Sequence, residues 1–295
     1  MVSTATAHPF FQVDVFSVRA GMGNPLAVVF DAEDLDDTQM QAIANWTNLA
    51  ETTFVLPPST REAHYRVRIF TTQREIAFAG HPSIGTAHAA LAAGRVTPTA
   101  GALVQECQAG LLPVQVDERD GSTTLSVRVP RSRIVRYAGA EDELVRRCLV
   151  GRKLGSIAPV LVEGGRRWWL AELADASEVR GMQPDIDAIR ELAAQSHSLG
   201  LCVFARSAGR GHDLVVRAFP LGVGIIEDPA SGAANAAIAA FLDEAGALAG
   251  LGDAYVVSQG REMARDSQLQ LRIDADRHVW VGGQCQTVIR GQLHW

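Results

Sequence analysis

Hydrophobic and polar residues are distributed unevenly along the 295-residue chain, and one long stretch carries no charge. Residues 229–242 read PASGAANAAIAAFL, which is almost entirely small and apolar. An exposed helix would carry charged residues on its outer side, so this pattern predicts a helix that is buried on every side. Asp228 at the N-cap and Pro229 at the first helical position predict a sharp helix start. The unpaired N–H groups of such a start favour a negatively charged ligand.

A second copy of this pattern lies in the first half of the chain. Residues 81–90 read HPSIGTAHAA and residues 228–237 read DPASGAANAA, so five of ten positions agree, including the proline and the glycine. An alternating, strand-like segment with a phenylalanine at or near its end precedes each copy, HYRVRIFT at 64–71 and HDLVVRAFP at 212–220. The copies are 147 residues apart, about half the chain length.

The regions upstream of the two copies also correspond. Residues 40–56 and 186–205 each predict a helix, a turn and a buried strand. We interpret the repeated order as an internal duplication that gives two similar α+β domains, which also fits the chain length. The predicted halves are 1–130 and 131–284, with the last strand, 285–295, as a candidate member of the first half. The alternative is a chance likeness between two generic strand–turn–helix segments.

The two copies differ at the predicted helix-cap position, which is His81 in one and Asp228 in the other. If the halves face each other across a pseudo-twofold axis, two helix starts converge on one cleft. Such a cleft suits an anionic ligand, because both amide ends favour negative charge. Gly85 and Gly232 would let backbone or ligand approach closely.

Composition narrows the class of protein. The chain is 47% hydrophobic and 20% charged with a net charge of −6, and no block of Lys and Arg stands out, which disfavours nucleic-acid binding. No apolar run approaches the roughly 18 to 20 residues of a membrane span. The cysteines form no CxxC pair and are typical of reduced thiols in a cytoplasmic protein. They are Cys107, Cys148, Cys202 and Cys285.

Few titratable residues lie in positions that indicate chemistry. Glu51, in NLAETTFVLP, sits where a helix gives way to a strand, and is either a solvated loop charge or a carboxylate at a cleft wall. At an apolar wall desolvation would raise its pKa, which suits a group that takes and returns a proton. His81 is either a structural residue or the partner of Asp228. The histidines lack metal-ligand spacing and no nucleotide-binding or hydrolase motif occurs, so neither a metal nor a cofactor is expected.

Five motifs in order identify a resemblance. The chain resembles the PhzF-like family, which includes the phenazine-biosynthesis isomerase and shares its architecture with diaminopimelate epimerase. The resemblance runs from about residue 11 to the C-terminus and implies two pseudo-symmetric domains, each a curved mixed β-sheet wrapped around a long central apolar helix. The motifs are VDVFSVRAGMGNPLAVVF (13–30), MQAIANWTNLAETTFVLP (40–57), YRVRIFTTQREIAFAGHPSIGTAHAAL (65–91), EDPASGAANAAIAAFL (227–242) and VSQGREM (257–263).

The resemblance also implies a function and a site. It implies a cofactor-independent isomerase that moves a proton within a small anionic substrate, in a cleft between the domains of a subunit that forms a homodimer. Glu51 matches the family's proton-transferring glutamate, and His81 and Asp228 match residues that hold the substrate. Main-chain amides at the two helix starts bind the substrate carboxylate. The substrate-binding positions implied there are Gly80, Ser83, Ser231, Gly232 and Ala233.

The chain departs from the family pattern at several positions. Ala233 and Ala50 stand where serine is usual, and Ala264 and Asp266 replace a glycine and a proline. The missing hydroxyl at Ala233 removes one hydrogen bond to the substrate, which bears on the phenazine-pathway reaction more than on acid–base chemistry. No cysteine falls in the helix-start motifs, so a two-thiol racemisation is not expected.

An isomerase is therefore the leading hypothesis, and two alternatives remain. One is an amino-acid-type epimerase or racemase that works without a cysteine pair. The other is a catalytically weak small-molecule-binding protein on the same scaffold. Trp168 and Trp169 could line the cleft, but packing in a core or an interface is the interpretation that their apolar surface favours.

Overall fold

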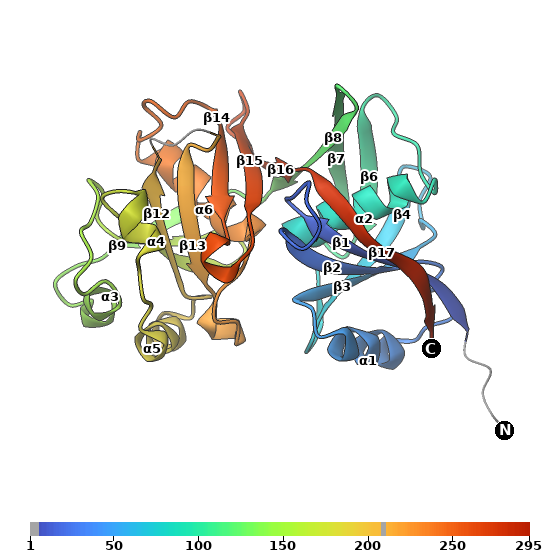
Figure 1. Ribbon diagram of the computed structural model, residues 1–295, viewed down its shortest axis with the longest axis horizontal. Coiled ribbons are helices and arrows are strands. Elements are labelled where there is room, and N and C mark those ends of the chain that lie inside the picture. Colours follow the sequence, from blue (N-terminus) through green and yellow to red (C-terminus); the bar gives the residue numbers. More distant parts are fainter. Residues whose placement is uncertain (1–5, 208–210) are drawn as a thin grey trace. The chain divides into compact units, whose positions relative to one another are not determined.

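The computed structural model describes residues 6–207 and 211–295, and the chain divides into two compact units (Figure 1). Unit 1 comprises Met1–Arg128 and Gly282–Trp295, and unit 2 comprises Val129–Val281. The sequence-predicted halves are 1–130 and 131–284, and these domain boundaries stay a prediction.

Unit 1 is built from a mixed sheet and two α-helices, one on its outside and one in its interior. Strand β17 returns from the end of the chain and pairs antiparallel with β1 along the whole of β1. The strands are β1 (Ala7–Val15), β2 (Asn24–Val29), β3 (Glu51–Leu56), β4 (Tyr65–Thr71), β5 (Glu75–Ile76), β6 (Ala102–Cys107), β7 (Gly110–Arg119), β8 (Ser122–Val129) and β17 (Cys285–His294). The helices are α1 (Asp37–Thr47) and α2 (Gly80–Ala92).

Unit 2 has the same kinds of element. Its strands are β9 (Arg133–Tyr137), β10 (Val160–Glu163), β11 (Arg167–Glu172), β12 (Leu201–Arg206), β13 (Leu214–Phe219), β14 (Ala254–Gln259), β15 (Ser267–Ile273) and β16 (Val279–Gly283), the last of which runs past the end of the unit. Its α-helices are α3 (Glu143–Cys148), α4 (Ala176–Arg180), α5 (Ile186–Ser196) and α6 (Gly232–Glu244). Short 3₁₀ turns are η1 (Leu221–Val223) and η2 (Arg261–Met263).

The order of strand pairing is the same in both units. In unit 1, β1–β2–β3–β4–β6–β7 pair in the order antiparallel, parallel, antiparallel, parallel, antiparallel. In unit 2, β10–β11–β12–β13–β14–β15 pair in that same order. Mixed sheets of this kind with helices between the strands make the chain an α+β protein, which confirms the predicted fold class at that level.

The helix–turn–strand segments predicted for 40–56 and 186–205 are present. Helix α1 leads into β3, and α5 leads into β12. Each helix ends at a left-handed residue, Asn48 with φ 54° and His197 with φ 50°, which reverses the chain toward the following strand. The apolar side of α1, with Met40 and Ile43, packs in a core cluster with residues of β2, β3 and β4.

Helices α2 and α6 are buried along most of their length. Helix α2 contacts β1, β2, β3, β6, β7 and β17, and α6 contacts β9, β10, β11 and β15. Small alanine side chains allow this because they let strands approach the helix closely. Gly85 of α2 is the tightest case, since a Cβ there would lie 2.6 Å from Leu26 and 2.7 Å from Val15. Its role is to admit side chains from β1 and β2 rather than a ligand.

The predicted start of the second buried helix was wrong. Helix α6 begins at Gly232, and its N-cap is Ser231, whose Oγ accepts a hydrogen bond from the N–H of Ala234. Asp228 lies before the helix, because its Oδ1 accepts from the N–H of Ala230 and forms a turn instead. Pro229 belongs to that turn. Burial on every side was also wrong in detail, because Ala233 is exposed.

The start of α2, the first buried helix, also differs from the prediction. Ala79 is the N-cap of α2 and makes no side-chain cap, so His81 is the second helical residue rather than the cap. Trp168 and Trp169 lie on β11 and are 2% and 1% exposed, which confirms that they pack in a core. Among the described residues, no helix combines the length and the hydropathy that a membrane crossing would need.

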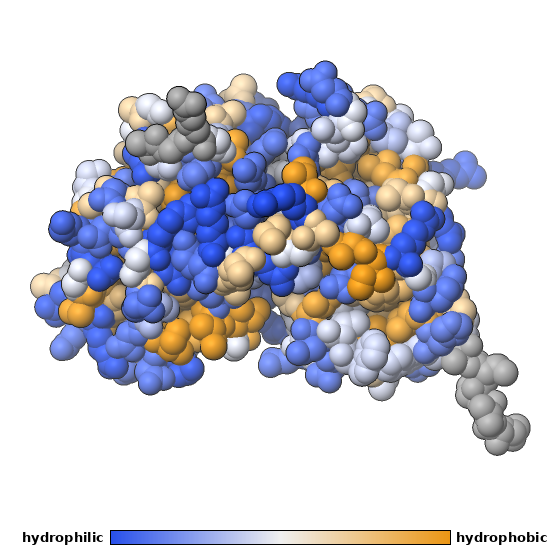
Figure 2. All heavy atoms as spheres, viewed as in Figure 1, coloured by the Kyte–Doolittle hydropathy of each residue, from blue (hydrophilic) through white to orange (hydrophobic). Residues whose placement is uncertain are grey.

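Exposed apolar side chains are present but dispersed. Trp46, Val18, Val150 and Ile226 are the most exposed large ones. Figure 2 shows hydrophobic and hydrophilic residues interspersed on the face that it presents. Single exposed apolar residues are normal on protein surfaces, so they do not by themselves mark a binding site.

Candidate active site

The structure brings together two of the three predicted catalytic residues. Glu51 is the first residue of β3, and its side chain is 18% exposed. His81 is the second residue of α2, and its side chain is 7% exposed. Nδ1 of His81 lies 3.4 Å from Oε2 of Glu51. The left-handed residue Asn48 ends α1 and turns the chain toward β3, which begins at Glu51 beside the start of α2.

His81 is neutral at physiological pH. Burial lowers the pKa of its imidazole to about 3, and the nearby main-chain carbonyl of Pro25, which favours the protonated ring, offsets this only in part. The contact with Glu51 is therefore not an ion pair near pH 7. Nε2 of His81 is buried and has no hydrogen-bond partner among the described residues. Buried polar atoms usually have a partner, so this nitrogen is suited to bonding a substrate or water.

Ser83, a predicted substrate-binding residue, is fully buried in α2. Its Oγ donates to the carbonyl of Ala79 at 2.9 Å and accepts from Nε2 of Gln105 at 3.0 Å. Tyr65 in turn donates its hydroxyl to Oε1 of Gln105 at 3.3 Å. This network fixes α2 on β4 and β6, which favours a structural role for the Ser83 hydroxyl. The contact of Ser83 with substrate stays a prediction, and so does that of Gly80, the first residue of α2.

Asp228, the third predicted catalytic residue, lies in unit 2. Its N–H donates to the carbonyl of Ala218 at 2.9 Å in an isolated β-bridge, and its carbonyl accepts from Nε2 of Gln259 at 2.7 Å. Its Oδ1 accepts from Ala230 at 3.0 Å. Its backbone is thus held at both the amide and the carbonyl.

Gln259 connects Asp228 to the start of α6. Its Oε1 accepts from the N–H of Ser231 at 3.3 Å and from Nδ2 of Asn235 at 2.8 Å. Asn235 also donates to the carbonyl of Ser231 at 2.8 Å. Gly232 begins the helix and is buried, whereas Ala233, the next residue, is exposed, and the contact of both with substrate stays a prediction.

Sequence reasoning missed the two buried glutamines, Gln105 and Gln259. Each lies in the strand that comes after its unit's buried helix, and each bonds to that helix near its start. Each glutamine comes after apolar residues of its strand, ALV before Gln105 and VV two positions before Gln259, and this could have signalled them, because a buried amide needs hydrogen-bond partners.

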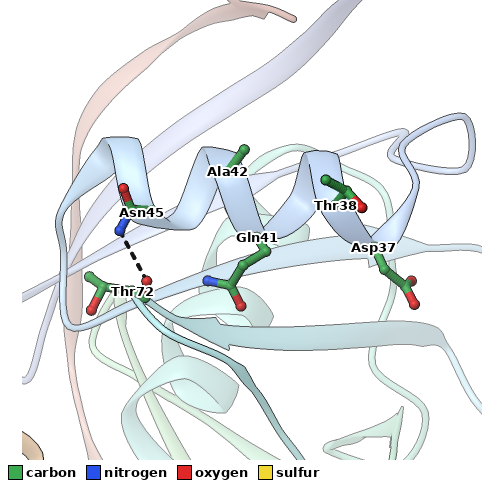
Figure 3. Close-up of a pocket in the computed structure, with 6 residues that line it drawn as sticks. All are labelled: Asp37, Thr38, Gln41, Ala42, Asn45 and Thr72. Carbon is green, nitrogen blue, oxygen red and sulfur yellow. Dashed lines mark hydrogen bonds between the residues drawn. The ribbon is translucent and has the colours of Figure 1, made fainter.

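One surface pocket lies on the outer side of α1 (Figure 3). Asn45 donates to the carbonyl of Thr72 at 3.2 Å across it. The pocket contains none of the predicted site residues, so it is not the candidate active site. It is lined by Asp37, Thr38, Gln41, Ala42, Asn45 and Thr72.

The turn before β16 holds a group of potential metal ligands, Asp274, Asp276 and His278, within 4.8 Å of one another. The carboxylate of Asp274 accepts bonds from the N–H groups of Asp276 and His278 and from Nε1 of Trp280. These hydrogen bonds explain why the three residues lie close together in the turn. The cluster therefore does not point to a metal centre.

Comparisons with known proteins identify relatives of the whole chain. The family model PhzC-PhzF, described as phenazine biosynthesis-like protein, matches residues 13–291. The chain is 34% identical to antisense-enhancing sequence 1 of Schizosaccharomyces pombe, over 97% of this chain and 99% of that protein. It is 31% identical to trans-2,3-dihydro-3-hydroxyanthranilate isomerase of Pseudomonas chlororaphis, with the same coverage of 97% and 99%. Among solved structures, a predicted epimerase from Pseudomonas aeruginosa matches with a TM-score of 0.78 and 29% identity, over 97% of this chain and 99% of that one.

Proposed function

Because the chain belongs to the PhzC-PhzF family of phenazine biosynthesis-like proteins, we propose that it is a cofactor-independent isomerase that moves a proton within a small carboxylate-bearing metabolite. Membership of the family and of an isomerase-type group of enzymes was predicted from the sequence motifs and is confirmed by the relatives. The proton shift, the site residues and the substrate are our proposal.

The observation that carries the proposal is the contact between Glu51 and His81. A half-buried carboxylate lies 3.4 Å from a buried imidazole that is neutral at pH 7. In the proposed reaction the Glu51 carboxylate takes a proton from a substrate carbon next to a π-system or carbonyl, and then returns it to another carbon. A neutral His81 has one N–H and one free lone pair, and it bonds a polar group of the substrate without adding a second charge.

The substrate carboxylate binds at helix starts in this proposal. The N-terminal turns of α2 and α6 present main-chain N–H groups, which attract anions. Gly80 lies at the first of these turns, and Gly232 and Ala233 lie at the second. Asp228, before α6, holds a polar group of the substrate. The proposal includes a cleft in which both helix starts meet the substrate.

The proposed cleft derives from an internal duplication with one long central helix in each half. The shared order of strand pairing in the two units supports it, and so does the burial of α2 and α6. A homodimer and a cytoplasmic location remain predictions from the family resemblance. Light scattering on the purified protein measures the first.

Incubation with substrate in D₂O tests the reaction. The first substrate to use is trans-2,3-dihydro-3-hydroxyanthranilate, on which the Pseudomonas chlororaphis relative is named to act. We expect isomerisation with deuterium appearing at the carbon that receives the proton, detected by NMR. Because Ala233 lacks the usual hydroxyl, we expect Ala233→Ser to speed turnover of this compound. Unchanged substrate across a wide set of carboxylates, with no deuterium entering any of them, contradicts the proposal.

An epimerase is the second candidate. The 29% identical solved relative is described as a predicted epimerase, and Glu51 and His81 could act as the two acid–base groups in place of thiols. Epimerisation of an amino acid exchanges the α-proton and removes optical rotation, whereas a double-bond shift changes the ultraviolet spectrum. Polarimetry on a panel of L-amino acids therefore separates the two reactions.

A binding protein with little turnover is the remaining alternative. The departure at Ala233 favours it, since a contact made in the family reaction is absent. Calorimetry combined with the D₂O assay distinguishes a binding protein from both enzymes. The distinguishing result is tight binding of a carboxylate without deuterium exchange, with the same affinity in Glu51→Gln.

A further inference from the structure

Unit 2 contains a buried arginine–glutamate pair immediately before Asp228. Nε of Arg217 donates to Oε1 of Glu227 and Nη2 donates to Oε2, both at 2.9 Å. Nη1 donates to the carbonyl of Met182 at 2.5 Å, and the guanidinium carbon lies 5.0 Å from the ring centre of Phe219. The side chains of Arg217 and Glu227 are 6% and 11% exposed. The arginine is therefore fixed on three sides.

Unit 1 contains a pair of the same kind at the corresponding strand. Nε and Nη2 of Arg68 donate to the two carboxylate oxygens of Glu75 at 2.8 and 2.7 Å, and the guanidinium lies 5.1 Å from the ring of Phe70. In both units the arginine precedes the stacked phenylalanine by two residues, on β4 or on β13. Because the arginine–glutamate pair occurs in both units, it is a feature of the shared strand arrangement rather than of one loop.

The two pairs differ in their distance along the chain from a predicted site residue. Glu75 lies in β5, six residues before His81, and the start of α2 separates the two. Glu227 is directly bonded to Asp228, so its position constrains the backbone of Asp228 itself. The third contact of Arg68 goes to the exposed Asp37, whereas that of Arg217 goes to a buried carbonyl.

We propose that Arg217 and Glu227 are positioning residues that set the place of Asp228 in the isomerase reaction. The inference rests on the proposed function. The planar guanidinium fixes both oxygens of Glu227, which prevents rotation of the segment that ends at Asp228. The β-bridge from Asp228 to Ala218 then fixes the next amide. Stability alone is a weak reason for burying such a pair, because desolvation offsets much of the attraction.

Amide hydrogen exchange of the full-length protein tests the positioning without any substrate. The variants are Glu227→Gln, which removes the charge, and Arg217→Lys, which keeps the charge and loses the two-point contact. We expect exchange of the Asp228 and Ala230 amides to become at least about tenfold faster in both, while the amides of β15 keep their rates. Unchanged rates at Asp228 overturn the inference, and so does an equal acceleration in β15, since that would mean general destabilisation.

A matched control is available in the same unit. Arg136 donates to both oxygens of Asp142 at 2.6 and 2.7 Å and lies 5.0 Å from the ring of Trp169. This pair does not precede a site residue. Asp142→Asn is expected to leave exchange at Asp228 unaltered, and acceleration there by the control would contradict a local effect of Glu227.

Kinetics then test the link to catalysis by a double-mutant cycle. Glu227→Gln is expected to lower kcat of the proposed isomerisation about 10- to 100-fold, because a small misplacement of a site group is costly. In an Asp228→Asn background it should cause no further loss, since its effect passes through Asp228. An equal loss in both backgrounds overturns the inference. If the wild type turns over no substrate, the proposed function fails, while the exchange rates still decide the positioning.

Discussion

Burial decides the protonation of His81 at the scale of single residues. The ring is buried at the start of α2 beside the start of β3, and no charge–charge contact raises its pKa enough to restore protonation. A neutral ring brings no positive charge to the contact with Glu51. This division of roles is what the proposed reaction needs, because one group must accept the proton and the other must bond without competing for it.

The folded-state pKa of His81 predicts acid sensitivity. That pKa is about 3, whereas an unfolded histidine titrates near 6.5, so between these values the unfolded state binds more protons. The stability contribution is full above about pH 6.5 and is lost as the pH falls toward 3. At pH 4.5 the loss is about 2–3 kcal/mol. Urea unfolding at pH 7.0 and 4.5 measures it.

His81→Asn is the control for this prediction. The variant lacks the titrating ring, so its loss of stability between pH 7.0 and 4.5 should be smaller than that of the wild type by about the same 2–3 kcal/mol. An equal loss in both proteins would mean that the ring is already protonated, or readily protonated, in the folded state.

Two of the three predicted catalytic residues lie together as the motifs suggested, whereas the local geometry predicted for the third was wrong. Glu51 and His81 could be singled out because the motifs that contain them are short and local. The structure then shows that the two side chains lie together. Asp228 was assigned to an N-cap that Ser231 occupies, since Asp, Ser and Asn all cap helices and the pattern could not choose between candidates three residues apart. Gln259 was missed because its partners come from a distant part of the chain.

At the scale of elements, α2 and α6 show how small residues allow a helix to be surrounded by strands. The absence of charge from 229–242 indicated a buried helix, and α6 is buried over most of its length. The apolar run did not reveal that the helix continues through a last turn with Asp243 and Glu244. It also did not reveal that Ala233 is exposed. Register and exact ends depend on caps and tertiary contacts, which a composition pattern does not contain.

Gly85→Ala tests the close packing of α2. A new Cβ would lie 2.6 Å from Leu26 and 2.7 Å from Val15, so those side chains must shift, and we expect a loss of about 1–3 kcal/mol. Gly80→Ala in the same helix is the control, because the nearest atom to its Cβ, in Val127, is 4.0 Å away. Denaturant titration of both variants gives the difference. Equal stability of the two would contradict the packing argument.

At the scale of the whole molecule, two units share one order of strand pairing and contain different predicted site residues. Glu51 and His81 lie in unit 1, and Asp228 and Ser231 lie in unit 2. Sequence repeats indicated two halves because the buried-helix motifs are conspicuous. The return of β17 to pair with β1 was only a candidate assignment, since pairing between the two ends of a chain leaves no local pattern.

Fragments test whether the units fold independently. Residues 129–281 form a continuous segment with a core cluster around Trp169, Ile189 and Phe219, so we expect a cooperative thermal transition by circular dichroism. Fragment 1–128 lacks β17 and exposes the edge of β1, so we expect it to unfold without cooperativity. Disorder in fragment 129–281 would contradict independent folding of unit 2, and cooperative unfolding of fragment 1–128 would show that its fold does not depend on β17.

Replacement of Glu51 by glutamine, assayed in D₂O on a turned-over substrate, tests the central claim most directly. Glu106→Gln in the same unit is the control, since Glu106 contacts Ser59 and lies outside the proposed site. We predict that Glu51→Gln lowers deuterium incorporation by at least about 100-fold while the control keeps the wild-type rate. Full incorporation in Glu51→Gln would contradict the assignment of Glu51 as the residue that moves the proton.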